Sequence, residues 1–339
     1  MFNAILIRRA EDQSMDTALT EMAPEALPEG DVQVRIDWST LNYKDALAIT
    51  GKGSIVRHFP MVPGIDLAGV VEHSDSADWS PGDRVLVNGW GVGESHWGGL
   101  AQKARLSSQW LTPLPENLNA RQAMSIGTAG YTAMLSLMTL ERHGLTPHKG
   151  DVLVTGASGG VGSFAIMFLA RSGYRVIAAT GRPEEQHYLK ALGASEIIHR
   201  DELASQGRPL GKTRWAGVID SVGSHTLANA CAHTREDGLV AACGLAQGLN
   251  FPGTVAPFIL RGVTLLGINS VTRPQAQRRE AWTRLAQEVD TDMLDTMTRE
   301  VTLSETIDAA DELLSGRIRG RLVVNVNGQA AGNRADAEP

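Results

Sequence analysis

Short stretches of alternating apolar and polar positions, broken by turn residues, dominate the first 125 residues. The strand-like stretches cover residues 4–8, 31–38, 65–72 and 84–87. A two-residue period between glycine- and proline-containing turns is typical of β-structure. We therefore expect residues 1–125 to form a compact, partly open β-barrel.

The pattern changes after about residue 125 to an alternation of strand-like and helix-like segments. Predicted strands cover residues 152–155, 176–180, 196–199, 217–220 and 238–243, with helices near Phe164, Glu185 and Leu227. Such alternation builds a parallel sheet covered by helices on both faces. We expect an α/β domain with a doubly wound parallel sheet over residues 126–299.

The C-terminal part begins with an unusually apolar strand, residues 263–268. With few charges to protect an edge, this strand is a candidate for pairing with its twin across a dimer axis, and an internal strand is an equal alternative. Helices are predicted over 275–289 and 305–314. The strand at 321–326 is expected to return to the first domain, which residues 300–328 would complete. Residues 329–339 are small and polar, which predicts a disordered tail.

A glycine-rich turn lies between the strand at 152–155 and the following helix. Its glycines are Gly156, Gly159, Gly160 and Gly162, and Ala157 takes the place of the first glycine of a strict G-x-G-x-x-G. Glycines allow a tight turn and a close approach of phosphate to the free N–H groups of the helix. The following helix and strand complete a βαβ unit, which favours dinucleotide binding over an ordinary loop. The predicted cofactor contacts in this turn are Ser158, Gly159, Gly160 and Val161.

The end of the second strand indicates which dinucleotide binds. An acidic residue here normally accepts hydrogen bonds from the ribose of NAD. The chain has Thr180-Gly181-Arg182 instead. A guanidinium pairs well with a 2′-phosphate, and the threonine hydroxyl adds a donor, so NADPH is favoured over NADH. The alternative is that Arg182 is a solvated loop residue.

Composition excludes several classes of function. At 339 residues the chain is long enough for two domains, and a net charge of −7 gives no basic footprint for nucleic acid or an anionic membrane. There is no apolar stretch of about 18 residues and no signal-peptide pattern at the N-terminus. Only Cys231 and Cys243 occur, both in apolar or small-residue surroundings, which predicts reduced thiols and a cytoplasmic location.

Several separated motifs resemble those of the medium-chain dehydrogenases/reductases. They lie at residues 42–45, 63–69, 81–85, 127–133, 156–162 and 320–321. The combination Asn-Tyr-Lys-Asp, Pro-Gly-Ile-Asp and Thr-Gly-Arg most resembles the acrylyl-CoA reductase subgroup. This resemblance implies a GroES-like barrel, a Rossmann domain, a cleft between them and a homodimer. It also implies NADPH-dependent reduction of acrylyl-CoA to propionyl-CoA. A quinone or enone oxidoreductase and a non-catalytic NADPH-binding protein are the alternatives.

The same comparison predicts an enzyme without zinc. Zinc-dependent relatives have a cysteine in the segment matching residues 42–45 and a His-Glu pair after the glycine matching Gly64. This chain has Asn42 and Ile65-Asp66 there, and catalytic zinc needs nitrogen and sulfur donors. Reduction of an electron-poor C=C bond does not require a Lewis acid, so direct hydride transfer is expected.

Further site residues follow from the resemblance and from strand ends. Asn42 and Tyr43 are expected at the reacting end of the substrate, and Tyr43 is also expected to contact the cofactor. Tyr43 could relay the proton; the alternatives are that Tyr43 is only packed in the barrel and that water supplies the proton. Thr128 resembles the residue near the nicotinamide phosphate, or else caps a helix. The remaining candidates are Gly244, Leu245, Asn269 and Ser270 after strand ends, Arg321 toward the cofactor, and Lys52, Arg57 and Arg273 for the phosphates of coenzyme A, with solvated charge as their alternative.

Overall fold

The computed structural model describes residues 1–11 and 14–328, so the predicted tail at 329–339 lies outside the described residues. The chain divides into two units. Among the described residues, unit 1 consists of Met1–Thr128, Val271–Ala286 and residues 290–328, and unit 2 consists of Ala129–Ser270 and Gln287–Val289. Most of residues 271–299, which the sequence pattern places with the parallel sheet, therefore lie in unit 1.

Unit 1 is built on a seven-stranded sheet. In sheet order its strands are β14 (Thr298–Thr302), β15 (Arg321–Asn325), β3 (Val32–Thr40), β4 (Asp66–Ser74), β5 (Arg84–Asn88) and β7 (Thr112–Pro113), with β6 (Lys103–Leu106) paired to β3. The β14–β15 pair is parallel and the other pairs are antiparallel. Strand β15 pairs with β3, a strand of the first domain, to which the sequence analysis expects the last strand to return.

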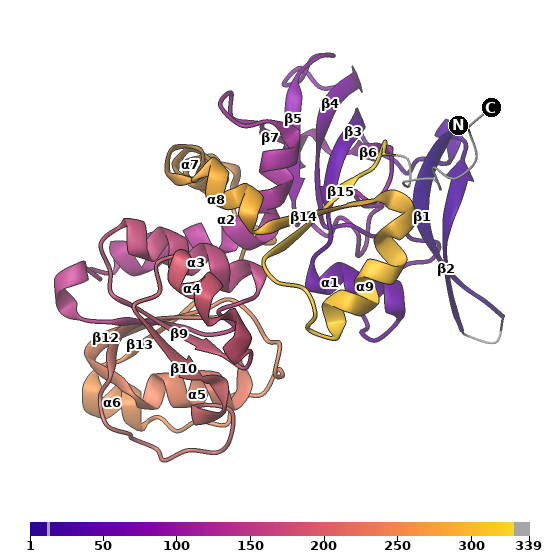
Figure 1. The fold of residues 1–339 in the computed structure, drawn as a ribbon. Coiled ribbons are helices and arrows are strands. Elements are labelled where there is room, and N and C mark those ends of the chain that lie inside the picture. The colour runs from indigo at the N-terminus through magenta and orange to yellow at the C-terminus, as the bar shows by residue number, and fades with distance from the viewer. Residues whose placement is uncertain (12–13, 329–339) are drawn as a thin grey trace, which may run out of the picture. The chain divides into compact units, whose positions relative to one another are not determined.

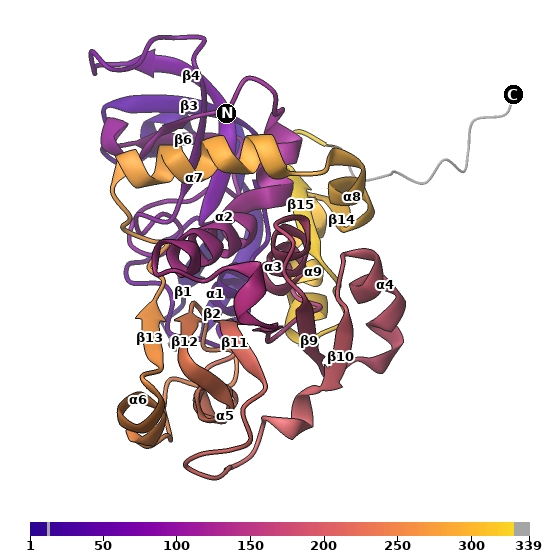
Figure 2. The same ribbon diagram turned by 90° about the vertical axis from the view of Figure 1, so that its left-hand side faces the viewer.

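A separate hairpin and several helices complete unit 1. The hairpin consists of β1 (Phe2–Arg9) and β2 (Met15–Met22). The helices are α1 (Tyr43–Thr50), α7 (Gln275–Glu288), α8 (Thr291–Thr296) and α9 (Thr306–Leu314), with 3-10 turns at Pro24–Ala26, Ser108–Trp110 and Leu303–Glu305. Helices α1 and α9 lie side by side at one end of the sheet (Figures 1 and 2). Apolar side chains from β3, β4, β5 and both helices form one core.

Unit 2 contains the parallel sheet predicted from the alternation. Its strands, in sheet order, are β10 (Glu196–His199), β9 (Val176–Thr180), β8 (Val152–Val154), β11 (Trp215–Asp220), β12 (Thr234–Ala242) and β13 (Thr264–Gly267). Helices α3 (Gly160–Arg171) and α4 (Gln186–Ala191) cover one face, and α5 (Ser224–Ala232) and α6 (Ala256–Arg261) cover the other (Figure 1). Short 3-10 turns lie at Pro147–Lys149, Pro183–Glu185 and Arg200–Glu202. Because the strand order reverses between β8 and β11, ligands are expected at the carboxyl ends of these strands.

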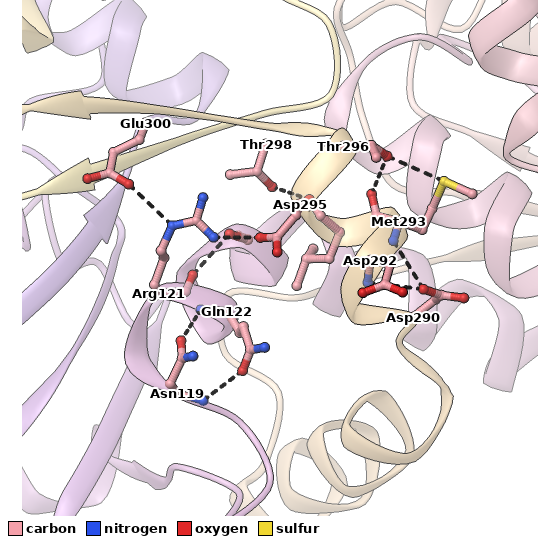
Figure 3. A network of polar contacts seen from close by, with 12 residues as sticks. Asn119, Arg121, Gln122, Asp290, Asp292, Met293, Asp295, Thr296, Thr298 and Glu300 are labelled. Carbon is pink, nitrogen blue, oxygen red and sulfur yellow. Dashed lines mark hydrogen bonds and ion pairs between the residues drawn. The ribbon is translucent and has the colours of Figure 1, made fainter.

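Helix α2 (Ala120–Arg142) is interrupted at Gly127, which has φ +49° and ψ −161°. Its first turn is held to the end of unit 1 by ion pairs from Arg121, Nη1 to Asp295 Oδ1 at 2.6 Å and Nε to Glu300 Oε2 at 3.3 Å (Figure 3). Asp290 caps α8 by accepting from two backbone N–H groups of its first turn. The ion pairs of Arg121 thus attach the start of α2 to α8 and β14.

Candidate functional site

The glycine-rich turn of unit 2 has the close packing that a nucleotide-binding loop requires. Gly156 lies in the left-handed region at φ +59°. A Cβ on Gly162 would lie 2.4 Å from the carbonyl oxygen of Gly156 and 2.6 Å from Cα of Ala157, so only glycine fits here. Gly159 is the N-cap of α3, and the helix presents free N–H groups at this end. The turn is therefore shaped to receive an anionic group such as a pyrophosphate.

Hydrogen bonds hold in place the residues at the end of β9 that are predicted to bind the 2′-phosphate of NADPH. Arg182 donates from Nε to the hydroxyl of Ser158 at 3.1 Å and from Nη2 to its carbonyl oxygen at 3.0 Å. The hydroxyls of Ser158 and Thr180 are 3.1 Å apart, and both residues are buried. The structure thus brings together Ser158, Thr180 and Arg182.

Arg200 is a second cationic residue at this position, and the sequence analysis missed it. A Cβ on Gly181 would lie 2.3 Å from Nε and 2.6 Å from Cζ of Arg200, so the guanidinium lies against the Gly181 backbone. Arg200 follows β10 directly, and β10 pairs in parallel with β9, with His199 opposite Thr180. The predicted strand 196–199 was the signal that could have identified it, because carboxyl ends of neighbouring parallel strands share one edge.

The other predicted unit 2 residues follow the strands at the same edge of the sheet. Gly244 and the exposed Leu245 come after β12, and Asn269 and Ser270 come after β13. A Cβ on Gly244 would lie 2.3 Å from the carbonyl oxygen of Ser221, so the chain approaches closely here. Their placement fits main-chain contact with a ligand at this edge, and the contact itself stays a prediction.

Unit 1 contains a buried polar centre around Asp66, which is defined here by Asn42, Asp45, Asp66, Thr128 and Arg321. The carboxylate of Asp66 is fully buried and accepts four hydrogen bonds. The donors are Asn42 Nδ2 at 2.8 Å, Asn88 Nδ2 at 2.7 Å, and Thr128 N at 2.8 Å and Oγ1 at 2.5 Å. Sequence analysis considered Asp66 only for zinc binding, and its role as the acceptor that organises this centre was missed.

Gly127 makes this centre geometrically possible. A Cβ at Gly127 would lie 2.6 Å from Nη2 of Arg321 and 2.9 Å from Oδ2 of Asp66. The break in α2 also frees the N–H of Thr128, which donates to Asp66. Thr128 is therefore engaged within unit 1 through both its backbone and its hydroxyl, and the helix-capping alternative does not describe it.

Asn42 is held in one orientation by three partners. Its Nδ2 donates to Asp45 at 3.1 Å and to Asp66 at 2.8 Å, and its Oδ1 accepts from Nη1 of Arg321 at 3.2 Å. Asn42 and Asp45 also form a capping box that begins α1. Since both amide hydrogens are engaged, Asn42 has none left in this arrangement to donate to a substrate oxygen.

Arg321 is likewise committed within unit 1. Its Nε donates to the carbonyl oxygen of Ser125 at 2.9 Å, and Nη2 donates to Thr40 Oγ1 at 2.9 Å. Burial lowers the pKa of Arg321, and the nearby carboxylates of Asp66 and Asp45 oppose that shift. In this structure Arg321 serves the polar centre, and any contact with cofactor stays a prediction.

Burial raises the pKa of Asp45 to about 7, and repulsion from the carboxylate of Asp66 adds to the effect. Hydrogen bonds from the backbone N–H groups of Asn42 and Ile65 act in the opposite direction. The polar centre therefore contains one group that changes charge near neutral pH.

Tyr43 differs from its neighbours because it is free of the network. It is the first residue of α1, directly after Asn42, and 49% of its surface is exposed. Its hydroxyl has no hydrogen-bond partner among the residues that the structure describes. Tyr43 is thus held at a defined backbone position with its hydroxyl available to a ligand.

The candidates for coenzyme A phosphates come from separate segments of unit 1. Lys52 forms an exposed ion pair with Asp311 at 2.9 Å. Arg57 is exposed, and Arg273 donates from Nη1 to Gln277 at 3.3 Å. The exposed ion pair favours the alternative that Lys52 is a solvated surface charge. In the described part of the chain, no three His, Cys, Asp or Glu side chains are grouped to hold a metal ion, and the zinc-free reaction stays a prediction.

No helix within residues 1–11 and 14–328 combines the length and apolar character needed to cross a bilayer.

Residues 28–116 match the alcohol dehydrogenase GroES-like domain, and residues 160–290 match the family described as zinc-binding dehydrogenase. Both matches agree with the expected fold class, a GroES-like domain with a nucleotide-binding parallel-sheet domain.

Three relatives resemble almost the whole chain. Acrylyl-CoA reductase AcuI of Ruegeria pomeroyi is 50% identical over 96% of this chain and 100% of its own length. The crystal structure of YhdH of Escherichia coli K-12 with bound NADPH is 49% identical, covers 96% of this chain and 100% of that chain, and has a TM-score of 0.93. The putative quinone oxidoreductase YhfP of Bacillus subtilis is 43% identical over 94% of this chain and 97% of its own length. Its crystal structure with NAD bound is 42% identical, covers 96% of this chain and 99% of that chain, and has a TM-score of 0.92.

Proposed function

This chain belongs to the medium-chain dehydrogenase/reductase family, in the group that contains the acrylyl-CoA reductases, and on that premise we propose that it reduces the C=C bond of acryloyl-CoA with NADPH to give propionyl-CoA. The observation that carries this proposal is the 50% identity with an acrylyl-CoA reductase over nearly the whole of both chains. The balanced reaction consumes acryloyl-CoA, NADPH and one proton and yields propionyl-CoA and NADP⁺.

The residues of unit 2 fit NADPH. Only glycine fits at Gly162, which leaves the start of α3 open to the pyrophosphate, and Arg182 and Arg200 supply two cations beside Gly181 for the 2′-phosphate. No carboxylate follows β9 directly to bind the ribose of NAD. When bound, NADPH supplies the hydride that the β-carbon of the substrate receives.

The residues of unit 1 are assigned to the substrate oxygen and the proton. Negative charge develops on the thioester oxygen as the β-carbon accepts hydride, and a hydrogen-bond donor stabilises it. The exposed hydroxyl of Tyr43 is the donor that we assign to this position and to protonation of the α-carbon. Asn42, whose amide is held by Asp45, Asp66 and Arg321, acts as a positioning residue that fixes the start of α1 and hence Tyr43.

The test is NADPH oxidation measured with acryloyl-CoA, a simple quinone and a longer enoyl-CoA in parallel. We expect the highest kcat/KM with acryloyl-CoA. A higher value with the quinone would favour the quinone oxidoreductase, an alternative supported by the similarity to YhfP. No turnover with any of the three would favour a non-catalytic NADPH-binding protein. Full turnover of acryloyl-CoA by Tyr43→Phe would show that Tyr43 is not the proton donor.

We also propose a homodimer formed through the β13 edge of unit 2. Strand β13 has β12 as its neighbour on one side, and three of its four residues are exposed. The adjacent α6 exposes Ile259 by 72% and Leu260 by 65%, which is unusual for large apolar side chains. Pairing of two β13 strands would bury these side chains and protect the edge. Light scattering should give twice the chain mass, and Leu260→Glu should give the monomer; a monomeric wild type contradicts the proposal.

The proposed location is the cytoplasm, which the free thiols of Cys231 and Cys243 support. Burial raises the pKa of each thiol to about 12, so neither is a reactive thiolate at neutral pH. Fractionation of cells that express the native gene, followed by immunodetection, would test this location.

A further inference from the structure

A cavity of about 650 Å³ in unit 1 is lined by the rings of Trp79, Trp90 and Trp110. Three of the seven tryptophans of the chain therefore gather at one place. The volume falls in the range of roughly 300–1,000 Å³ that small-molecule sites have. None of these three residues belongs to the polar centre or to the glycine-rich turn, so the cavity requires its own explanation.

Two of the three rings are fixed by polar or aromatic contacts. Trp79 donates from Nε1 to the carbonyl oxygen of Ser108 at 3.1 Å. Trp110 packs edge to face with His96, with ring centroids 5.0 Å apart and planes at 79°. These two indoles are preorganised, which reduces the entropy that a ligand would lose on stacking against them.

Trp90 is held in a backbone conformation that bulky residues rarely adopt. Its φ is +58°, in the left-handed region, which costs on the order of 1–2 kcal/mol for a residue with a Cβ. The N–H of Trp90 donates to Val271 at 3.0 Å, and the guanidinium of Arg278 lies 4.8 Å from the ring centroid. Backbone strain that the surrounding structure maintains is concentrated at functional sites.

The rim of the cavity carries one cation and one carboxylate. Arg279 comes from α7 and is exposed, and its side chain has no ion pair in the part of the chain that the structure describes. Asp78 precedes Trp79 in the loop between β4 and β5 and is also exposed. A ligand that suits this arrangement is a planar aromatic group with a hydrogen-bond donor on its edge and an anionic substituent.

We propose that this cavity binds the adenine and 3′-phosphate end of coenzyme A in the acyl-CoA substrate. The adenine stacks on the indoles, Arg279 pairs with the 3′-phosphate, and Asp78 accepts from the exocyclic amino group. Trp90 lies two residues after Asn88, whose amide donates to Asp66, so the cavity wall is continuous in the chain with the polar centre. This inference rests on the proposed function, because it assigns the part of that substrate which does not react.

The experiment compares acryloyl-CoA with acryloyl-pantetheine, which lacks the proposed ligand together with the ribose and the 5′-diphosphate that join it to pantetheine. Trp110→Ala and Arg279→Ala are expected to raise KM for acryloyl-CoA about tenfold each, with kcat unchanged, since one stacked base or one phosphate contact contributes that much. KM for acryloyl-pantetheine is expected to stay the same. Arg8→Ala removes an exposed cation from β1 of the same unit and serves as the matched control.

Two results would overturn the inference. One is an unchanged KM for acryloyl-CoA in both variants, and the other is an equal rise in KM for both substrates, which indicates a general packing defect. Trp110→Phe keeps an aromatic ring and should retain most of the affinity, which separates stacking from misfolding.

A calorimetric titration with adenosine 3′,5′-bisphosphate decides the question even if acryloyl-CoA is not turned over. It is carried out on the full chain with saturating NADP⁺, so that the 2′-phosphate position beside Gly181 is filled. We expect binding to the wild type and about tenfold weaker binding to Arg279→Ala. An absence of binding to the wild type would refute the assignment of the cavity independently of the proposed reaction.

Discussion

Replacing Asp66 with asparagine should destabilise unit 1, because four donors surround its carboxylate. One oxygen accepts from Asn88 and Thr128 Oγ1, and the other accepts from Asn42 and Thr128 N. Whichever way the new amide is oriented, its NH₂ group faces the NH₂ group of Asn42 or Asn88. A donor then meets a donor in a buried site, and at least one hydrogen bond is lost.

The magnitude follows from the buried guanidinium of Arg321. Two carboxylates, Asp66 and Asp45, favour the charged form of Arg321, and Asp66→Asn removes the first of them. The second, Asp45, has a pKa of about 7 and is therefore partly neutral at neutral pH. Leaving a buried donor without an acceptor costs about 1–3 kcal/mol, and more where a buried charge such as that of Arg321 also loses a favourable carboxylate nearby. Since whole domains have unfolding free energies of about 5–15 kcal/mol, the loss should be plainly measurable.

The assay is urea unfolding followed by tryptophan fluorescence, with Asp16→Asn as the matched control. Asp16 is exposed on β2 of the same unit, and its replacement should change the unfolding free energy by less than about 0.5 kcal/mol. A loss below about 1 kcal/mol for Asp66→Asn, with an unchanged denaturant slope, would refute the assignment of Asp66 as the organising acceptor of the polar centre.

Three further predictions concern pH, packing and cofactor choice. Because its pKa is raised to about 7, Asp45 binds a proton more tightly in the folded chain than in the unfolded chain, and the stability that this contributes is fully present below about pH 4 and lost as pH rises through about 7. Between about pH 5 and 8, the unfolding free energy of the wild type should therefore fall more than that of Asp45→Asn. Parallel losses in the two proteins would contradict this. Gly162→Ala should weaken NADPH binding at least about tenfold, because the new Cβ would clash with the carbonyl oxygen of Gly156. An unchanged affinity in a binding titration would contradict the assignment of this turn as the nucleotide-binding loop. Arg182→Ala and Arg200→Ala should each raise KM for NADPH about ten- to hundredfold and leave KM for NADH unchanged, and steady-state kinetics in which both values rise together would exclude a 2′-phosphate role.

The sequence predicted the parallel sheet well because its signal is local. Each strand of unit 2 is a short apolar stretch, and each βα connection is marked by glycines or by polar residues. Arg182 was found because a single strand end defines its position. Arg200 required one further step, the pairing of β10 with β9, before its place beside Gly181 could be deduced.

The polar centre of unit 1 was not predictable in the same way. Asn42, Asn88 and Thr128 reach Asp66 from 24, 22 and 62 positions away along the chain. Only the folded chain shows that the amide of Asn42 is fully used and that Tyr43 beside it is free. The resemblance to known reductases selected both residues, and the structure assigns them different roles.

The placement of residues 271–299 also depended on tertiary contacts. Helix α7 was predicted almost within its observed bounds, yet its pattern gave no indication of the unit that it joins. Buried Arg278 and Trp282 donate to the carbonyl and side-chain oxygens of Asn88 at 2.8 and 3.1 Å, and these contacts attach α7 to unit 1.

The central claim is that hydride passes directly from NADPH to the β-carbon of acryloyl-CoA. The most direct measurement uses NADPH deuterated at both C4 positions, acryloyl-CoA and enzyme treated with a metal chelator, followed by mass and NMR analysis of the product. The account predicts propionyl-CoA with one deuterium on the β-carbon, none on the α-carbon, and an undiminished rate after chelation. Deuterium on the α-carbon, its absence from the product, or a rate lost with the metal would contradict it.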